Sequence, residues 1–296
     1  MGRAFAEAFP EAAARFAEAS EALGFDLAAL CFHGPAEALA LTANTQPAIL
    51  TASMAALAGL TRRNIRPDFV AGHSMGEYSA LVAAGALDFA HAVRLVRKRG
   101  EFMQEAVAVG VGTMAALIGL EVAAVQAVCG EAADAGVVEV ANLNAPDQIV
   151  IAGERAAVER AVALAKARGA KRAVPLPVSA PFHCRLMQPA AARLREVLAT
   201  VPLGDLQVPW VTNVDAVPIR KGAEVAEALV RQVAAPIRWV EGVERLRREG
   251  VETFVEVGPG KVLTGLIRRI APEVRTFPVE DLTGLEAAAA AVGGAR

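Results

Sequence analysis

The sequence contains few of the residues that build covalent or metal-linked frameworks. Among its 296 residues are three cysteines, Cys31, Cys129 and Cys184, which are widely spaced and form no Cys-x-x-Cys pair. An odd and scattered set predicts reduced thiols rather than a disulfide framework or a zinc site. We therefore expect no bound metal and a reducing compartment.

Strong net charge and long apolar runs are also missing. The 30 basic and 32 acidic residues leave a net charge of -2, so no general field attracts nucleic acid or an anionic membrane. Charges or prolines interrupt every apolar stretch before it could span a bilayer. The residues after Met1 lack the basic-then-apolar pattern of a signal peptide. These absences predict a cytoplasmic protein that binds neither nucleic acid nor membrane.

The residues that are present indicate a globular α/β protein. Apolar residues make up 54% and charged residues 21% of the chain, which is typical of soluble globular proteins. The length allows a core of normal size in one large or two modest domains. From the spacing of apolar residues we expect helices over 3–23, 46–60 and 88–107, with Asp88 capping the third, and buried strands over 69–71, 210–214 and 253–257.

A different pattern interrupts this body between residues 110 and 178. The predicted elements there are strand 113–119, helix 121–135, strands 137–143 and 147–152, helix 154–168 and strand 172–178. The order β-α-β-β-α-β is that of a ferredoxin-like fold. We therefore expect a ferredoxin-like subdomain at 110–178, inserted into a catalytic body made of residues 1–109 and 179–296.

The most informative motif is Gly72-His73-Ser74-Met75-Gly76, which follows the short apolar strand and precedes a helical pattern. It matches the G-x-S-x-G nucleophile elbow, where side chains two positions before or after the serine would crowd a tight turn. A bare match occurs by chance in about one chain in ten of this length. Ser74 is therefore either a nucleophile or a buried serine in a strand-to-helix turn.

A serine nucleophile needs a base, and the chain has four histidines: His33, His73, His91 and His183. His73 adjoins Ser74, and neighbouring side chains on a strand diverge. His33 lies in a His-Gly-Pro loop, and His91 lies on a helix. His183 remains, at the expected start of a helix over 184–199, where the helix dipole favours the neutral form that a general base requires. The alternative is a structural histidine at a helix start.

One arginine lies on the apolar face of its predicted helix. In the helix over 88–107, Arg99 is three or four residues from Val96, Phe102 and Met103, inside the apolar stripe. A buried guanidinium needs an anionic or hydrogen-bonding partner, and its planar fork matches a carboxylate. The partner is either a protein Asp or Glu or a carboxylate on the substrate.

Two other signals are weak. Gly258-Pro259-Gly260-Lys261 lacks the spacing of a P-loop and the Ser or Thr that follows its lysine, so we interpret it as a strand-to-helix turn. Asn142 and Asn144 lie at an expected hairpin tip, where turn chemistry alone explains them.

Four blocks together resemble the malonyl-CoA:acyl carrier protein transacylases of bacterial fatty-acid synthesis, along nearly the whole chain and in order. They are GHSMGEYSA at 72–80, RKRGEFMQ at 97–104, VSAPFH at 178–183 and EVGPG at 256–260. The resemblance implies an α/β-hydrolase-like body with a parallel sheet and a ferredoxin-like insert. It also implies malonyl-CoA as substrate, acyl carrier protein as partner and no cofactor. We further expect a monomer.

The resemblance also implies roles for individual residues. Ser74 is the expected nucleophile, His183 the base and Arg99 the clamp for the malonyl carboxylate. No Asp completes a triad in this family. Instead, a backbone carbonyl orients the histidine, and it falls on Gln232, near the end of a helix that stops before Pro236. The other expected site residues are Gln46, which lines the site, and Met75, whose backbone N–H binds the oxyanion.

The sequence departs from the family pattern at its start. The family opens with a strand running into Phe-Pro-Gly-Gln-Gly-Ser-Gln, whose glutamine N–H is a second oxyanion donor. This chain begins at Met1-Gly2-Arg3, and its Phe9-Pro10 is followed by Glu11. We expect the second donor to be missing, at a cost of about a hundred- to a thousandfold in turnover.

Three alternatives stay open at this point. An esterase or thioesterase would use the same serine and histidine, although it would usually have an acidic residue orienting the base. An acyltransferase of polyketide assembly would accept another extender unit, and Phe182 before His183 favours malonyl only by resemblance. An inactive remnant or binding partner would have no transferase activity.

Overall fold

The N-terminal third of the chain is helical in the computed structural model, which describes residues 1–178 and 180–293. Ser179, part of the 178–183 block, lies outside them. The helix expected over 3–23, with a turn or kink near Pro10, is two helices, because Phe9 is extended and Pro10, which has no N–H to lose, opens the second. The helices here are α1 (Arg3–Ala8), α2 (Pro10–Leu23), α3 (Leu27–His33), α4 (Ala36–Ala40) and α5 (Thr42–Arg62).

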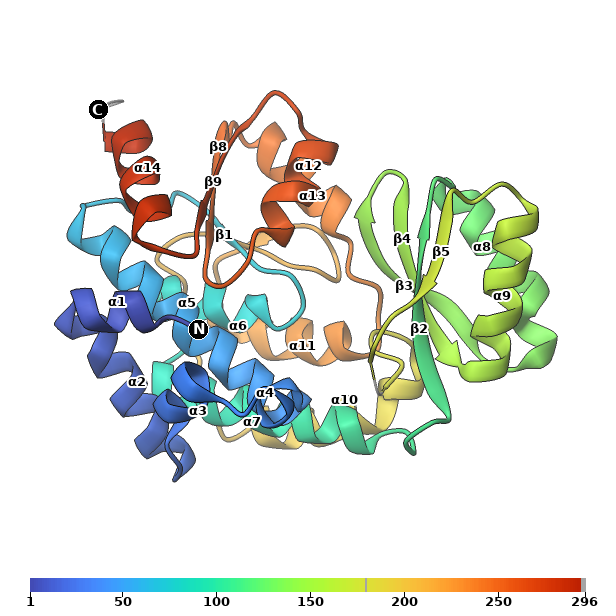
Figure 1. Cartoon of the computed structure of the whole chain (residues 1–296), viewed down its shortest axis with the longest axis horizontal. Coiled ribbons are helices and arrows are strands. Elements are labelled where there is room, and N and C mark those ends of the chain that lie inside the picture. The colour runs from blue at the N-terminus through green and yellow to red at the C-terminus, as the bar shows by residue number, and fades with distance from the viewer. Residues whose placement is uncertain (179, 294–296) are drawn as a thin grey trace.

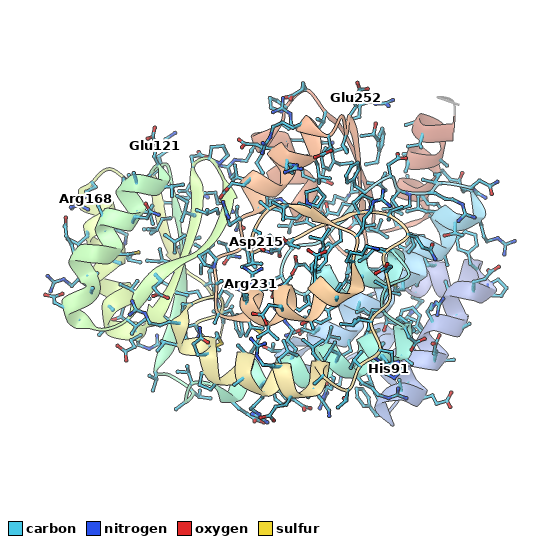
Figure 2. The ribbon with its side chains drawn as sticks, turned by 180° about the vertical axis from the view of Figure 1, so that it is seen from behind. His91, Glu121, Arg168, Asp215, Arg231 and Glu252 are labelled. Atoms are coloured by element: carbon cyan, nitrogen blue, oxygen red, sulfur yellow. The ribbon has the colours of Figure 1, made fainter. Side chains whose placement is uncertain are left out.

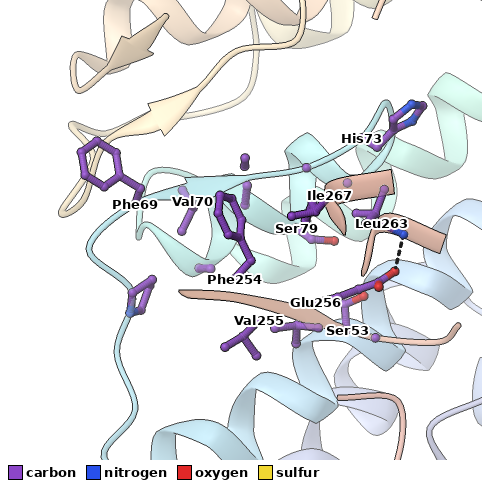
Figure 3. Close-up of a pocket in the computed structure, with 18 of the residues that line it drawn as sticks. Ser53, Phe69, Val70, His73, Ser79, Phe254, Val255, Glu256, Leu263 and Ile267 are labelled. Carbon is purple, nitrogen blue, oxygen red and sulfur yellow. Dashed lines mark hydrogen bonds between the residues drawn. The ribbon is translucent and has the colours of Figure 1, made fainter. Parts of the chain in front are cut away.

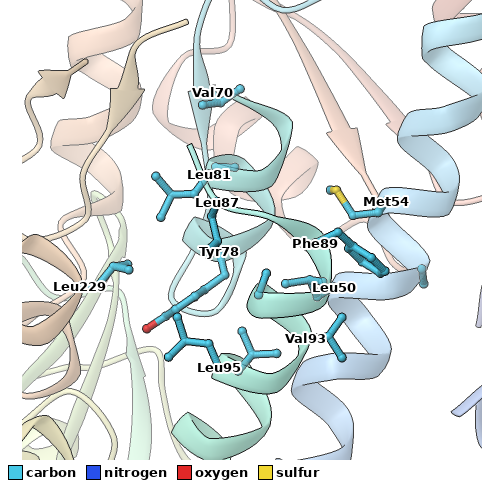
Figure 4. Close-up of a cluster of buried hydrophobic side chains, with 14 of the residues drawn as sticks. Leu50, Met54, Val70, Tyr78, Leu81, Leu87, Phe89, Val93, Leu95 and Leu229 are labelled. Carbon is cyan, nitrogen blue, oxygen red and sulfur yellow. The ribbon is translucent and has the colours of Figure 1, made fainter. Parts of the chain in front are cut away.

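The main core joins α5 to α7 (Phe89–Glu105), the helix that carries Arg99. Asp88 caps α7 as predicted, since its Oδ1 accepts the N–H of His91 at 3.1 Å. Between the two helices the chain forms β1 (Val70–Ala71) and α6 (Gly76–Ala83). The side chains buried where these elements meet include Leu50, Leu81, Phe89 and Val93 (Figure 4).

The long apolar helix α5 belongs to this core. It spans 21 residues and buries Leu50, Ala52 and Leu60. Within residues 1–178 and 180–293, no helix is both long enough and apolar enough to cross a membrane.

Residues 112–175 form a separate antiparallel sheet with its own core. The strand order is β3-β4-β2-β5, and α8 and α9 pack together on the outer face (Figure 1). Met114 and Val150 on the other face pack against Cys184, next to His183. The elements are β2 (Gly112–Ile118), α8 (Val122–Ala132), a 3₁₀ turn (Ala133–Ala135), β3 (Val138–Ala145), β4 (Gln148–Glu154), α9 (Arg155–Ala167) and β5 (Arg172–Pro175).

The last part of the chain returns to the body. Its elements are a 3₁₀ turn (Arg185–Met187), α10 (Gln188–Leu198), β6 (Trp210–Val211), β7 (Pro218–Ile219), α11 (Gly222–Val233), α12 (Trp239–Arg248), β8 (Thr253–Val257), α13 (Val262–Ile270), β9 (Arg275–Val279) and α14 (Leu282–Gly293). Figure 2 shows the exposed Arg231 and Asp215 from behind; their ion pair ties α11 to the turn after β6.

The parallel sheet that the resemblance implied for the body is only partly present. Its strands form two sheets, β1-β6-β7 and β8-β9. Strands β1 and β6 are parallel, β6 and β7 are antiparallel, and β8 and β9 are parallel. Strand β8 was expected to be buried, but all of its residues are only half-buried, because one side of it lines a large cavity.

Candidate active site

The elbow at residues 72–76 places Ser74 at the turn between β1 and α6. Ser74 has a φ of 53°, in the left-handed region that non-glycine residues rarely adopt. A Cβ added to Gly72 would lie 2.0 Å from the backbone of Gly76, so only glycine allows this approach. A Cβ at Gly76 would meet nothing within 4 Å. The expectation that a side chain at Gly76 would crowd the turn is therefore wrong. The crowding occurs at Gly72, where a side chain would meet the backbone of Gly76.

Asn213 braces this strained turn. It follows β6, whose parallel pairing with β1 brings the ends of both strands together. Its Oδ1 accepts the Ser74 N–H at 2.7 Å, and its Nδ2 donates to the Gly72 carbonyl at 2.7 Å. Strained backbone persists only where surrounding contacts hold it, and these two hydrogen bonds do so on both sides of His73.

His183 lies within hydrogen-bond reach of the Ser74 hydroxyl. The distance between His183 Nε2 and Ser74 Oγ is 2.7 Å. The other ring nitrogen, Nδ1, lies 2.9 Å from the carbonyl oxygen of Gln232. A carbonyl only accepts, so Nδ1 carries the proton and Nε2 is free to accept from Ser74. This is the geometry that a serine nucleophile, its base and an orienting group require.

The neutral form of His183 has a different cause from the one we expected. No α-helix begins beside it: residues 185–187 form a 3₁₀ turn and α10 starts only at Gln188, so the helix-dipole argument does not apply. Burial, and after it the positive charge of Arg99, lower the pKa of His183 to about 3. The histidine is thus uncharged near neutral pH because of its surroundings.

Arg99 is buried with its guanidinium beside the serine. Its Nη1 donates to Gln46 Oε1 at 2.8 Å, and its Nη2 donates to Gln232 Oε1 at 2.8 Å and to Ser74 Oγ at 3.1 Å. Burial lowers its pKa. Within the described ranges none of these three hydrogen-bond partners is a carboxylate, and Nε has no partner. The protein thus supplies neutral acceptors and leaves donor capacity for an anion.

Met75 is the cap residue immediately before α6. Its backbone N–H has no acceptor in the part of the chain that the structure describes. Such N–H groups at the start of a helix are suited to developing negative charge.

His73 points away from this chemistry and towards the small sheet. Its Nε2 lies 2.8 Å from Asn144 Oδ1 and 3.5 Å from Asn142 Nδ2, and its ring packs against Trp239. Interpreting the two asparagines as turn residues alone was wrong, because both contact the elbow. They connect the four-stranded sheet to the residue beside Ser74.

A cavity of about 950 Å³ opens from this site. Besides Ser74, His183 and Arg99, it is lined by β1 and β8, which face one another across it. Figure 3 shows Val70 on one side and Phe254 and Val255 on the other. Apolar walls next to a few polar groups are typical of a ligand site.

A carboxylate in β8 caps the helix that follows this strand. Glu256 accepts the N–H groups of Leu263 and Thr264 at 2.9 and 2.7 Å, which caps the start of α13 (Figure 3). Those donors are therefore occupied. The sequence-based rejection of a phosphate loop at Gly258–Lys261 agrees with this geometry.

Two residues that support the site, Glu77 and Asn213, were not predicted from the sequence. Glu77 is buried and contacts both the Asn213 segment and Gln232. Its position, an acid inside the apolar helix that follows the elbow, was a usable signal. Asn213 also had one, as a polar residue at the carboxyl end of a parallel strand, where such folds place their sites.

The comparisons with known proteins point to one family. The family model for the acyl transferase domain matches residues 1–287. The malonyl CoA-acyl carrier protein transacylase of Bacillus subtilis is 49% identical over 289 residues, covering 97% of this chain and 91% of that protein. The enzyme of the same name from Escherichia coli K12 is 51% identical, covering 96% and 92%.

Solved structures agree. The malonyl CoA-acyl carrier protein transacylase of Coxiella burnetii superimposes with a TM-score of 0.96 at 44% identity, covering 98% of this chain and 92% of that one. A malonyl-transacylase bound to a holo type II PKS acyl-carrier protein gives a TM-score of 0.96 at 47% identity, covering 98% and 94%.

Proposed function

This chain belongs to the malonyl CoA-acyl carrier protein transacylase family of acyltransferases, and we propose on that basis that it moves a malonyl group from coenzyme A to the phosphopantetheine thiol of acyl carrier protein in fatty-acid synthesis. The observation that carries the proposal is the position of one oxygen. Ser74 Oγ lies between a neutral imidazole at 2.7 Å and a buried guanidinium at 3.1 Å. The first activates a nucleophile, and the second selects an acyl group that ends in a carboxylate.

The first half-reaction forms an ester on Ser74. Nε2 of His183 takes the hydroxyl proton as Oγ attacks the thioester carbon, and the Met75 N–H donates to the oxyanion. The carbon–sulfur bond breaks, and His183 returns its proton to the departing coenzyme A thiolate. The Gln232 carbonyl accepts from Nδ1 throughout and stabilises the imidazolium.

The second half-reaction reverses these steps with another thiol. His183 takes the proton of the phosphopantetheine thiol, and the sulfur attacks the ester carbon. The bond to Oγ breaks, Ser74 recovers its proton, and the malonyl group leaves on the carrier protein. No step needs a metal or a cofactor. Because the two thiols use one site in turn, initial-velocity plots should be parallel, as ping-pong kinetics require.

We assign the body, residues 1–109 and 179–296, to an α/β-hydrolase-like architecture and residues 110–178 to a ferredoxin-like subdomain. The elbow between β1 and α6 supports the first assignment. The element order β-α-β-β-α-β with antiparallel strand order β3-β4-β2-β5 supports the second.

The deciding experiment is intact mass spectrometry after mixing the protein with malonyl-CoA. We expect one malonyl adduct, mapped to Ser74 by peptide digestion, and its loss when holo acyl carrier protein is added. Ser74→Ala should give no adduct. Absence of the adduct from the folded wild type would refute the proposal.

Two rival activities give different outcomes. A thioesterase would release free malonate and leave the carrier protein unloaded. It would usually orient its base with an acid, whereas His183 Nδ1 faces a carbonyl. Polyketide assembly would supply a different carrier protein, and the relative bound to a type II PKS acyl-carrier protein favours testing that partner. Offering both carrier proteins and methylmalonyl-CoA separates these possibilities.

A further inference from the structure

Glu77 holds together three segments around the site without touching the reacting atoms. It lies one turn after Ser74 in α6 and is 1% exposed. Its Oε1 accepts the backbone N–H of Asn213 at 2.5 Å, and its Oε2 accepts from Nε2 of Gln232 at 2.7 Å. One carboxylate thus joins the elbow helix to the segment after β6 and to α11.

The contact with Gln232 fixes which way its side-chain amide faces. Nε2 donates to Glu77 and also to the Ser74 carbonyl at 2.7 Å, while Oε1 accepts from Arg99 Nη2 at 2.8 Å. A flipped amide would set its oxygen against two acceptors and its NH₂ group against the guanidinium. Glu77 and the Ser74 carbonyl together therefore select the orientation that presents an acceptor to Arg99.

The contact with Asn213 works on the elbow itself. Glu77 holds the backbone of Asn213, whose side chain bonds Ser74 N–H and the Gly72 carbonyl. The exposed Arg231–Asp215 ion pair joins the same two outer segments but contacts neither the elbow nor Arg99. It therefore provides a control for the connection between these two segments.

We propose that Glu77 is a positioning residue for acyl-group selectivity, acting through the Gln232 amide on the direction of the Arg99 guanidinium. This inference rests on the proposed malonyl transfer. A Gln at position 77 would have the same size, but it offers one acceptor and one donor where two donors must be met. Where the new NH₂ group faces Gln232, that amide loses one of its two acceptors and is held beside Arg99 by the Ser74 carbonyl alone; where it faces Asn213, the elbow support loses its acceptor instead.

The test compares malonyl-CoA with acetyl-CoA in the acylation half-reaction of Glu77→Gln, followed by intact mass. We expect the malonyl-to-acetyl ratio of kcat/KM to fall on the order of tenfold, the worth of one weakened charged hydrogen bond. Asp215→Asn, the control, should keep the wild-type ratio. Equal losses for both acyl groups in Glu77→Gln would overturn the inference and reduce Glu77 to a structural role.

A second variant shows whether the effect passes through Gln232. In a Gln232→Met background, adding Glu77→Gln should leave the selectivity ratio unchanged, because the intermediary is already gone. Independent multiplication of the two effects would contradict the proposed route. If Glu77→Gln does not fold, Glu77→Asp, which keeps the carboxyl group but is too short to reach both donors, is judged by the same ratio. Failure of wild type to form any malonyl adduct would instead refute the proposed function.

Discussion

Removing the Arg99 guanidinium should change which acyl group the site prefers. In Arg99→Ala, both substrates lose the support that Arg99 gives to Gln46, Gln232 and Ser74. Only malonyl also loses an anionic contact. A hydrogen bond between a guanidinium and a carboxylate contributes about 1.5–3 kcal/mol. We therefore expect kcat/KM for malonyl-CoA to fall roughly 10- to 150-fold more than kcat/KM for acetyl-CoA.

The assay measures acyl-Ser74 formation from each coenzyme A ester, so that the carrier protein does not enter the comparison. Arg99 is only 2% exposed, so thermal unfolding must accompany the kinetics. Arg99→Lys is the matched control: it keeps the charge but not the fork, and its selectivity should lie between those of Ala and Arg. Equal losses for malonyl and acetyl in Arg99→Ala would refute the reasoning, because they would show that Arg99 supports the site without contacting the substrate carboxylate.

The remaining predictions concern the base, the elbow and the core. His183→Ala should abolish the malonyl adduct seen by mass spectrometry while the protein stays folded. The pKa of His183 is lowered from 6.5 to about 3 on folding, so the folded state binds fewer protons between these values. The contribution of neutral His183 to the free energy of unfolding should therefore be complete above pH 6.5 and lost as the pH falls towards 3. The acylation rate should not decrease with an apparent pKa near 6.5 as the pH is lowered. Such a decrease would contradict the assignment. Asn213→Ala should slow acylation of Ser74 by both acyl groups alike, since it frees the elbow, and a change in selectivity alone would argue against that role. Leu50→Ala should lower the free energy of unfolding in urea by about 2–5 kcal/mol with little effect on selectivity.

Much of the site could be predicted because its chemistry depends on residue types and local spacings that are visible in the sequence. A G-x-S-x-G turn needs close backbone approach, and at Gly72 a Cβ would lie only 2.0 Å from the Gly76 backbone, which is the physical reason for that signal. An arginine inside an apolar stripe must find buried acceptors, which are the two glutamine amides. Both features depend on local spacing, so the sequence carries them directly.

The supporting groups were harder to foresee because they depend on tertiary contacts. The sequence around Asn144 indicates only a turn, and its contact with His73 depends on how the four-stranded sheet packs against the body. Asn213 and Glu77 are far apart in sequence, and their meeting depends on β6 pairing with β1. The neutral state of His183 was expected for the wrong reason, since neither the burial of His183 nor its proximity to Arg99 follows from helix spacing.

The fold shows the same division. The order of elements between 110 and 178 followed from alternation and helical period, which are local patterns. The division of the body strands into β1-β6-β7 and β8-β9 did not, because an apolar run predicts a strand without telling which neighbours it pairs with.

The strand that leads into the elbow is short and supported on one side only. Among the described residues, strand β1 has two residues, lies at the edge of its sheet beside β6, and lines the cavity with Val70 and Ala71. Opening this segment therefore breaks few hydrogen bonds, so its amides should exchange with solvent faster than those of α7. A ligand that fills the cavity would add contacts along the open edge and slow that exchange. We thus expect the acyl-enzyme cycle to be accompanied by a cycle of local ordering, in which the empty protein has the looser elbow.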